Sequence, residues 1–322
     1  MKKMIALMMA VLMMLTLVAC GSADSGGSNA DAAYSIGVCQ LVQHEALGAA
    51  TQGFIDTVNA ALGEENINWD IQNAAGDSNT CNTIVNGFVS SNVNLIMANA
   101  TPALQAASVA TGTIPVLGTS VTEYGVALGI ENFSGLVGTN VSGTSDLAPL
   151  DKQAEMIVEW CPDAKTVGLL YCSAEANSQY QVDAVSALLE AKGITCTLYP
   201  FTDSNDIQAV CQQAADNNDV LYVPTDNTAA SNAGIIDGIC HGKVPVFAGE
   251  EGLCKGCGVA TLSISYYDLG VATGEMAAKI LKGEASVSEM EIGYAATVTP
   301  KYNAANCEAL GLTPPAGYEA IG

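Results

Sequence analysis

The stretch SIGVCQL, from Ser35 to Leu41, returns in similar form as TVGLLYC, from Thr166 to Cys172. Both segments are short, rich in apolar or β-branched residues and followed by polar residues, as is typical of buried strands. In each half we expect a helix and two further strands to follow. They are expected at residues 46–62, 69–73 and 95–98 in the first half, and at residues 178–191, 195–201 and 220–223 in the second. Roughly 130 residues separate equivalent points, far more than the period of a solenoid repeat. The sequence therefore predicts two similar halves.

The correspondence extends to the helix starts and the fourth strands of the two halves. The Asp-Ser-Asn triplets at residues 77–79 and 203–205 occupy matching positions, and each offers side chains that cap the first turn of a helix. The fourth strands are expected at residues 114–116 and 244–246. Because strands alternate with helices, each half is predicted to be an α/β lobe with a parallel sheet.

The arrangement of two such lobes predicts where a ligand binds. Ligands of open parallel sheets bind beyond the carboxyl ends of the strands, so two facing lobes enclose a cleft. A hinge motion would close that cleft around a small molecule. We expect lobe 1 to comprise residues 33–141 and 266–285, and lobe 2 to comprise residues 142–265 and 286–322. The chain would then cross between the lobes three times.

The N-terminus has the features of an export signal. The sequence opens with Met-Lys-Lys and continues as an apolar run from Met4 to Val18, which is shorter than the roughly 20 residues of a membrane span. Leu17-Val18-Ala19-Cys20 resembles the lipobox of bacterial lipoproteins, in which the signal is cleaved and the new N-terminal cysteine is acylated. We expect a signal peptide at residues 1–20, a lipid on Cys20 and a flexible tether at residues 21–32. The protein would then be extracytoplasmic and anchored to the cell membrane.

Charge and composition exclude several classes of partner. The chain has a formal net charge of -23, and its acidic residues are spread along its length. Nucleic acids are bound by basic patches that neutralise phosphates, so we expect no nucleic-acid partner. Only His44 and His241 could join cysteines in a zinc site, and no second CxxC motif completes a set. We therefore expect no metal and no cofactor.

The cysteine count permits disulfides. Eleven cysteines leave ten once Cys20 is assigned to a lipid, an even number in a compartment where disulfides form. Pairing is plausible, but the sequence does not give the connectivity. Cys254-Lys-Gly-Cys257 lies among glycines and is interpreted as a turn with a local disulfide or two free thiols, rather than as a redox site.

Several longer stretches together resemble one family. They are QLVQHEALGAATQGF, NAAGDSNTCNTI, LIMANATPALQAA, GTSDLAPLDKQ, PDAKTVGLLYCSAEANSQYQV, YVPTDNTAASN, VPVFAGEEG and ISYYDLGVATGEMAAKILKGE. From about Ile36 to Leu312 the chain is similar to the substrate-binding proteins of ABC transporters, typified by the tryptophan-type receptor of Gram-positive bacteria. The resemblance implies a type I periplasmic-binding-protein fold, with two Rossmann-like lobes joined by a three-crossing hinge. It also implies a monomer that delivers a small solute, most simply an amino acid and possibly an aromatic one, to an ABC permease and its ATPase.

Polar residues at the predicted strand ends are the candidate site. Thr101-Pro102 places a hydroxyl at an expected N-cap and proline at the first helical position, leaving amides for a ligand carboxylate or for an ordinary cap. Asp226 offers a charge suited to a ligand ammonium, or a second cap, and one of the adjacent Glu250 and Glu251 is expected to point inward. The expected ligand-binding residues are Gln43, His44, Thr101, Pro102, Thr119, Ser120, Glu175, Asn177, Ser178, Thr225, Asp226, Asn227, Thr228, Glu250 and Asp268. Tyr180, Tyr267 and Phe247 are lower-ranked candidates for contacts with an aromatic ligand.

Two other functions fit the same architecture. Catalysis would need a nucleophile with a positioned base, and the chain has no GxSxG elbow, P-loop or GxGxxG fingerprint. Glu250 and Glu251 could in principle act as acid and base, but adjacent residues in one loop seldom face a substrate from opposite sides. We therefore expect no enzyme. A sensor that reports its ligand to a membrane partner needs the same closing lobes, and the sequence leaves transport and sensing open.

Overall fold

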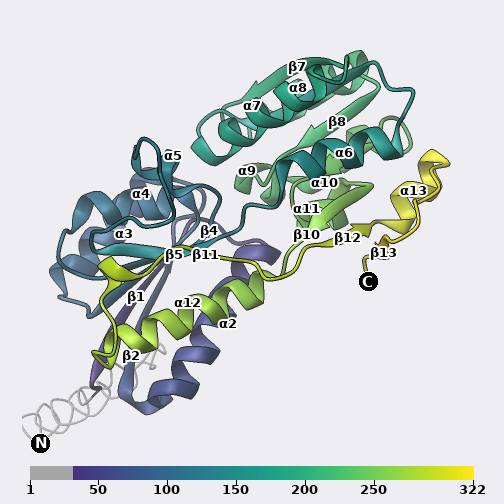
Figure 1. Ribbon diagram of the computed structural model, residues 1–322. Coiled ribbons are helices and arrows are strands. Elements are labelled where there is room, and N and C mark those ends of the chain that lie inside the picture. Colours follow the sequence, from purple (N-terminus) through teal and green to yellow (C-terminus); the bar gives the residue numbers. More distant parts are fainter. Residues whose placement is uncertain (1–31) are drawn as a thin grey trace, which may run out of the picture.

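Two parallel-dominated sheets, each covered by helices on both faces, form the two lobes of the protein (Figure 1). The structure is a computed structural model that describes residues 32–322. The predicted signal peptide, the predicted lipidation site Cys20 and all but the end of the predicted tether lie outside the described residues. The α/β class expected from the sequence is confirmed.

Lobe 1 contains a six-stranded parallel sheet in the order β11-β5-β4-β3-β1-β2. The strands are β1 (Tyr34–Gln40), β2 (Ile67–Asn73), β3 (Leu95–Asn99), β4 (Val116–Val121), β5 (Val141–Ser145) and β11 (Gly293–Tyr294). The helices are α2 (Glu45–Leu62), α3 (Ser78–Ser90), α4 (Thr101–Ala110), α5 (Tyr124–Leu128) and α12 (Tyr266–Leu281), with short 3-10 turns η1 (Glu64–Asn66) and η2 (Val287–Glu289).

Lobe 2 contains a seven-stranded sheet in the order β13-β12-β10-β9-β8-β6-β7, in which only the β10–β12 pair is antiparallel. The strands are β6 (Thr166–Cys172), β7 (Thr195–Phe201), β8 (Val220–Val223), β9 (Val246–Ala248), β10 (Ala260–Ser263), β12 (Thr299–Tyr302) and β13 (Glu319–Ala320). The helices are α6 (Leu150–Trp160), α7 (Ala176–Glu190), α8 (Ile207–Asn217), α9 (Asn227–Ser231), α10 (Ala233–Cys240), α11 (Glu251–Cys257) and α13 (Ala304–Leu310).

The central strands explain why the opening sequence stretch decides the fold. In β1, Ile36 and Val38 pack against Phe54 of α2 on one face, whereas Cys39 packs against Phe88 of α3 on the other. The inner strands β6 and β8 are likewise buried on both faces. Strands buried on both faces read as continuous apolar runs, which is the pattern that predicted them.

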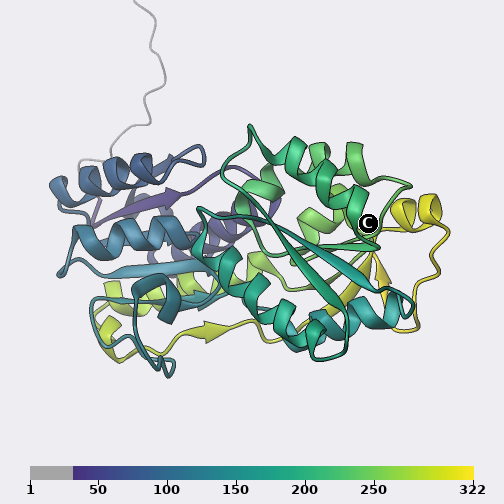
Figure 2. The same cartoon turned by 90° about the horizontal axis from the view of Figure 1, so that it is seen from above.

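The chain crosses between the lobes three times, at residues 146–149, 264–265 and 295–298 (Figure 2). The first sheet includes β5 and β11, so lobe 1 extends beyond residue 141 and beyond residue 285, where the sequence placed its ends. The short polar sequence of β5 gave no strand pattern. Its Thr144 is buried and polar. The Thr144 hydroxyl oxygen is hydrogen-bonded to those of Thr119, at 3.2 Å, and Thr273, at 2.9 Å.

Two glycines let α2 and α12 pack side by side on one face of the lobe 1 sheet (Figure 1). A Cβ atom on Gly53 would lie 2.2 Å from the carbonyl oxygen of Tyr267, and a Cβ atom on Gly270 would lie 2.0 Å from that of Ala50. The two backbones are therefore closer than any larger residue allows. Since α12 begins directly after the second crossing, this packing also holds one of the three crossing segments of the hinge in place.

The two Asp-Ser-Asn triplets differ in the structure. Asp77 is the N-cap of α3 and accepts the amide of Thr80 at 2.6 Å, as predicted. The second triplet does not start a helix, because α8 begins only at Ile207, with Asp206 as the N-cap residue. The carboxylate of Asp206 accepts the amide of Thr202 at 3.1 Å and so folds the intervening residues into a loop.

The cysteine motif of α11 is helical rather than a turn, which corrects the sequence interpretation. Glu250 caps the helix, and Cys254 and Cys257 are both buried within it as free thiols. Burial raises the pKa of both thiols well above its usual range, so they are poor nucleophiles. All ten cysteines of the described residues are free. Cys211 and Cys240 are in contact, with 3.7 Å between their sulfur atoms.

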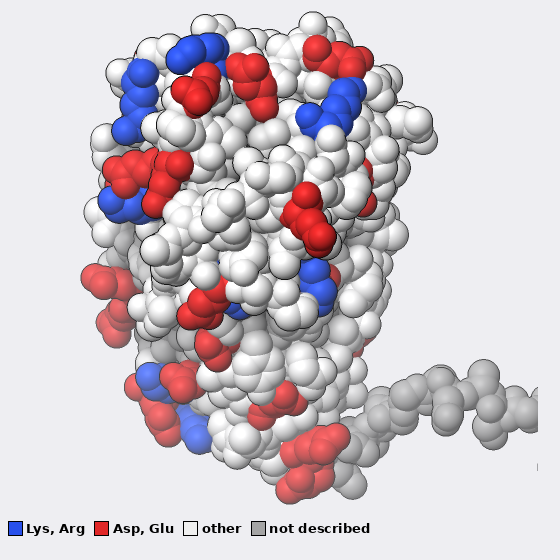
Figure 3. All heavy atoms as spheres, turned by 90° about the vertical axis from the view of Figure 1, so that its right-hand side faces the viewer, with Lys and Arg blue, Asp and Glu red and all other residues white. Residues whose placement is uncertain are grey.

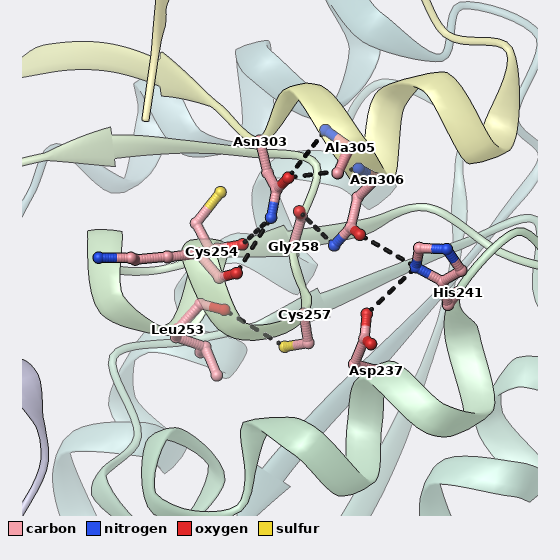
Figure 4. A network of polar contacts seen from close by, with 10 residues as sticks. Asp237, His241, Leu253, Cys254, Cys257, Gly258, Asn303, Ala305 and Asn306 are labelled. Atoms are coloured by element: carbon pink, nitrogen blue, oxygen red, sulfur yellow. Dashed lines mark hydrogen bonds and ion pairs between the residues drawn. The ribbon is translucent and has the colours of Figure 1, made fainter. Parts of the chain in front are cut away.

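The C-terminal segment is fixed to lobe 2 by two asparagines (Figure 4). Asn303 caps α13 and donates to the carbonyl oxygen of Lys255 at 3.0 Å. Asn306 donates to the carbonyl oxygen of Gly258 at 3.0 Å, and its own oxygen lies 3.1 Å from Nδ1 of His241. His241 is therefore part of a structural network that stabilises the end of the chain.

Most of the surface is uncharged, and acidic side chains outnumber basic ones among its charged residues (Figure 3). On the face shown in Figure 3, lysines lie apart from one another among acidic side chains and form no continuous basic patch. Exposed pairs of this kind include Lys152 with Glu155 at 2.7 Å and Lys243 with Asp216 at 2.5 Å. None of the helices within residues 32–322 combines the length and apolar character that crossing a bilayer requires.

Candidate ligand-binding site

A cavity of about 380 Å³ lies between the lobes, at the carboxyl ends of strands from both sheets. Lobe 1 contributes the segments after β1 and β2 and the start of α4, and lobe 2 contributes the segments after β6, β7 and β8. Four of the predicted residues line this cavity, namely Pro102, Glu175, Asn227 and Thr228. The rule that ligands bind beyond strand ends therefore leads to a real interlobe cavity.

Glu175 connects two loops of lobe 2. It is 4% exposed and accepts hydrogen bonds from the backbone amides of Asn227 and Thr228 at 3.1 and 2.9 Å. It also accepts from the side-chain amide of Asn227 and the hydroxyl of Thr228, both at 2.7 Å. The loop after β6 thus holds the first turn of α9 in place.

Asp226 is fully engaged within its own lobe. Its Oδ1 accepts the amide of Ala229 at 2.8 Å, which makes it the N-cap of α9, and its Oδ2 accepts the amide of Cys172 at 2.6 Å. Burial, together with the nearby charge of Glu175, raises the pKa of Asp226 to about 7. The structure therefore assigns Asp226 the capping role that the sequence left open, with both oxygens occupied.

A hydrogen bond joins the two lobes across the cleft. His44, the residue before α2, places its Nε2 3.2 Å from Oδ1 of Asn227 in lobe 2. Burial lowers the pKa of His44, so the neutral imidazole is favoured and can donate to the Asn227 oxygen. The lobes are in contact here, and the cleft is closed.

The lobe 1 rim carries unusual backbone conformations. Ala100 has φ of 92° and Ser120 has φ of 54°, a region that non-glycine residues seldom adopt. Ala100, rather than Thr101, is the N-cap of α4, so Thr101 is the first helical residue and Pro102 the second. No side chain caps this helix, and its first amides remain available. Strained residues of this kind concentrate at ligand sites.

Ser120 lies where the register between β4 and β5 shifts, between Gly118 and Val121. Its hydroxyl is buried and has no hydrogen-bond partner within the described part of the chain. The same is true of Oδ1 of Asn177 and Oδ1 of Asp146. Buried polar atoms are nearly always hydrogen-bonded, so these three oxygens, among seven unpaired buried side-chain atoms of residues 32–322, are candidates for contact with a bound solute.

A second interlobe cavity, of about 430 Å³, lies beside the crossing segments. Both Glu250 and Asp268 line it. Glu250 accepts the amides of Gly252, at 2.6 Å, and of Leu253, and burial raises its pKa to about 7. Glu251 lines the same cavity and lies 2.7 Å from Nζ of Lys301, so both adjacent glutamates border this space.

A third interlobe cavity, of about 470 Å³, is lined by aromatic rings. Tyr124 and Phe133 are stacked with centroids 6.5 Å apart, and Tyr294 completes the lobe 1 side. Lobe 2 contributes Tyr180, one of the rings proposed from the sequence, and Leu147. Four aromatic residues line this cavity, against two, Tyr266 and Tyr267, in the cavity beside the crossing segments.

Some predicted residues lie outside these groups. Gln43 is exposed and bonded to Gln40, and the Thr119 hydroxyl bonds within lobe 1. Among the lower-ranked rings, Tyr267 lines the second cavity and is bonded to Asp56, whereas Phe247 is fully buried in the lobe 2 core. The remaining predicted residues Ser178 and Thr225 are in the lobe 2 network, where Asn177 donates to the carbonyl oxygen of Thr225 at 3.0 Å.

Sequence reasoning missed Asp146 and Tyr266, which are both buried at the crossings. The hydroxyl of Tyr266 donates to Oδ2 of Asp146 at 2.9 Å. Asp146 directly follows β5, so the strand-end rule would have found it if the polar segment 141–145 had been recognised as a strand.

Two α/β lobes closed over buried polar groups at their strand ends define a clamshell solute-binding protein. Residues 35–314 match the family of ABC transporter substrate binding proteins, and the chain belongs to this family. The family consists of solute-binding proteins, so the chain is not an enzyme, and such proteins of ABC importers act outside the cytoplasm. The resemblance seen in the sequence is thereby confirmed.

Individual relatives agree with this assignment. The tyrosine-binding protein of Clostridioides difficile (strain R20291) is 33% identical over 303 residues, covering 90% of this chain and 87% of the relative. The structure of an ABC domain from Streptococcus pneumoniae in complex with L-Trp is 29% identical, covers 89% of this chain and 99% of that chain, and has a TM-score of 0.84. A ligand-free, open structure of a substrate binding protein with adhesive properties from Clostridium difficile is 38% identical, covers 89% and 99% of the two chains, and has a TM-score of 0.68.

Proposed function

We propose that this protein captures an aromatic amino acid between its lobes and delivers it to an ABC permease with its ATPase, as a monomer anchored to the membrane through a lipid on Cys20. The observation that carries the proposal is the set of unpaired buried oxygens on Ser120, Asp146 and Asn177, at the carboxyl ends of strands from both lobes. A polar solute held between the lobes supplies their missing partners.

The aromatic cavity supports the choice of ligand. An aromatic side chain gains affinity from ring contacts and from burial, and rings of Tyr124, Phe133 and Tyr180 line the cavity from both lobes. The names of the two relatives that bind tyrosine and L-Trp point the same way. The chain contains no arginine that could bind a ligand carboxylate. The uncapped first turn of α4 offers backbone amides for this role instead.

The arrangement of the lobes supports capture by closure. The structure superposes better on the L-Trp complex than on the ligand-free open protein, although the open protein is more similar in sequence. The His44–Asn227 contact across the cleft belongs to this closed arrangement. Opening about the three crossings would break that contact and expose the cleft.

Ligand binding is tested by a thermal-shift screen of residues 32–322 against amino acids, with tyrosine, tryptophan and phenylalanine first. We expect an aromatic amino acid at 100 times its Kd to contribute about 2.7 kcal/mol and to raise Tm by several degrees. The same ligand is expected to reduce the radius of gyration in small-angle scattering. A screen in which no amino acid raises Tm would overturn the proposed ligand class.

Membrane anchoring is tested with Cys20→Ser in the full chain expressed in a bacterium that processes lipoproteins. Because the acyl chains would be attached to the Cys20 sulfur and its new amino group, the variant should lose them and remain unprocessed. In a detergent phase separation, we expect the parent protein and Cys161→Ser in the detergent phase, with a labelled-palmitate signal on both and none on Cys20→Ser. Cys161→Ser is the matched control, and equal labelling of all three proteins would contradict the anchor.

A further inference from the structure

Four carboxylates are buried around the cleft, and three of them are already satisfied. Glu175 accepts four hydrogen bonds from the start of α9, and Asp226 accepts one backbone amide on each oxygen. Glu250 accepts the two amides of the first turn of α11. These three groups therefore stabilise loops within lobe 2 and have little capacity left for a ligand.

Asp146 differs from the other three. It is 3% exposed, one oxygen accepts the Tyr266 hydroxyl at 2.9 Å, and the other oxygen has no partner among the described residues. A buried carboxylate without a countercharge is costly, and proteins normally pair it. The chain has no arginine, and the lysines on this side of the hinge, Lys255 and Lys301, pair with other glutamates. The missing partner is a cationic donor.

The surroundings of Asp146 fit an ammonium group. The amide of Asp146 donates to the carbonyl oxygen of Val121, which places it next to Ser120 and its unpaired hydroxyl. At the strand ends of lobe 2, Asn177 donates its amide hydrogens to the oxygens of Glu175 and Thr225, and its own Oδ1 is a further unpaired acceptor. An ammonium group has three N–H donors and no acceptor, and so complements oxygens of this kind.

We propose that Asp146 binds the α-ammonium group of the ligand, and that Tyr266 positions the Asp146 carboxylate for this contact. The inference rests on the proposed function and names the residue that recognises the amino group of the ligand. Asp146 lies in the first crossing and Tyr266 at the start of the helix after the second. An ammonium bound here therefore contacts the hinge itself, which couples ligand binding to lobe closure.

The test compares each aromatic amino acid with its deaminated analogue by isothermal titration calorimetry. The pairs are L-tyrosine with 3-(4-hydroxyphenyl)propionate and L-tryptophan with indole-3-propionate. We expect the parent protein to prefer the amino acid by on the order of 100-fold, because an unpaired buried charge is left when the ammonium is missing. In Asp146→Asn the preference should fall to a few-fold, through weaker binding of the amino acid.

Asp151→Asn is the matched control, because it removes the same charge from an exposed position five residues away. It should keep the full preference. If Asp146→Asn also keeps the full preference while folding normally, the inference is wrong. If the parent protein binds no amino acid at all, the proposed function fails instead, so the two failures can be told apart.

A pH profile of the parent protein provides a second measurement that needs no variant of Asp146. Burial raises the pKa of Asp146 to about 6, although the hydroxyls of Tyr266 and Thr122 favour the ionised form, and the titratable groups facing it are Tyr266, Tyr124 and Glu250. Ionised Asp146 is the form that binds an ammonium, so affinity should be constant above this pKa and fall as pH drops through it. Between pH 7 and pH 5 we expect about a tenfold loss for the amino acid relative to the deaminated analogue.

Tyr266→Phe tests the positioning role. Loss of the hydroxyl removes a hydrogen bond that favours the ionised carboxylate, so the pKa of Asp146 should rise. The midpoint of the pH profile is then expected to move to higher pH, while the preference for the amino acid at pH 8 is largely kept. An unchanged midpoint in Tyr266→Phe would remove Tyr266 from this role. If the affinity of the parent protein for the amino acid relative to the deaminated analogue stays constant between pH 5 and pH 7, the inference is wrong.

Discussion

Gly270→Ala is expected to lower the free energy of unfolding by about 3 kcal/mol, because overpacking at a rigid contact costs about 1–3 kcal/mol or more. The added Cβ atom would lie 2.0 Å from the carbonyl oxygen of Ala50 and 2.9 Å from the backbone nitrogen of Phe54. Both are backbone atoms of α2, so no side-chain rotation relieves the clash and the two helices must separate. Urea unfolding of residues 32–322 measures the effect.

Gly87→Ala is the matched control for this prediction. Gly87 lies in the interior of α3, and a Cβ atom there would have no heavy atom within 4 Å. Alanine is better than glycine in a helix interior by about 1 kcal/mol, so this variant should be slightly more stable than the parent. If the two variants change stability equally, the close packing of α2 and α12 does not limit this lobe.

The inner strands could be predicted from the sequence because they are buried on both faces. β1, β6 and β8 each present apolar side chains to helices above and below the sheet, which produces the continuous apolar runs that marked them. β5 could not be found in this way. Its sequence VSGTS is buried through hydroxyl hydrogen bonds to neighbours distant in the sequence, and such bonds leave no periodic pattern. The predicted lobe boundaries were displaced for the same reason.

The candidate site was predictable in position but not in the roles of its residues. The strand-end rule located Glu175, Asp226 and Asn227, because their loops follow β6 and β8. Whether an oxygen is free for a ligand depends on which backbone amides reach it, and those amides come from other loops. Asp226 thus has both oxygens occupied, while Asp146, which the strand pattern missed, has one left over.

The same reasoning gives Glu175→Ala the largest expected effect on stability within lobe 2. Removing the carboxylate leaves two backbone amides and two side-chain donors of Asn227 and Thr228 without their acceptor, in a site that is almost completely buried. Breaking a buried network of this kind costs about 3–5 kcal/mol. For a protein of this size we expect Tm to fall by roughly 10 °C.

Glu190→Ala and Glu175→Gln separate this effect from a simple loss of charge. Glu190 is the exposed last residue of α7, and its replacement should change stability by no more than about 0.5 kcal/mol. Glutamine at position 175 keeps one acceptor oxygen, so that variant should lie between the parent and the alanine variant. Differential scanning calorimetry of the parent and the three variants without ligand gives the order of their Tm values. If Glu175→Ala melts with the parent, the loop after β6 does not depend on its contacts with α9, and Glu175 is then free to contact a ligand as the sequence first suggested.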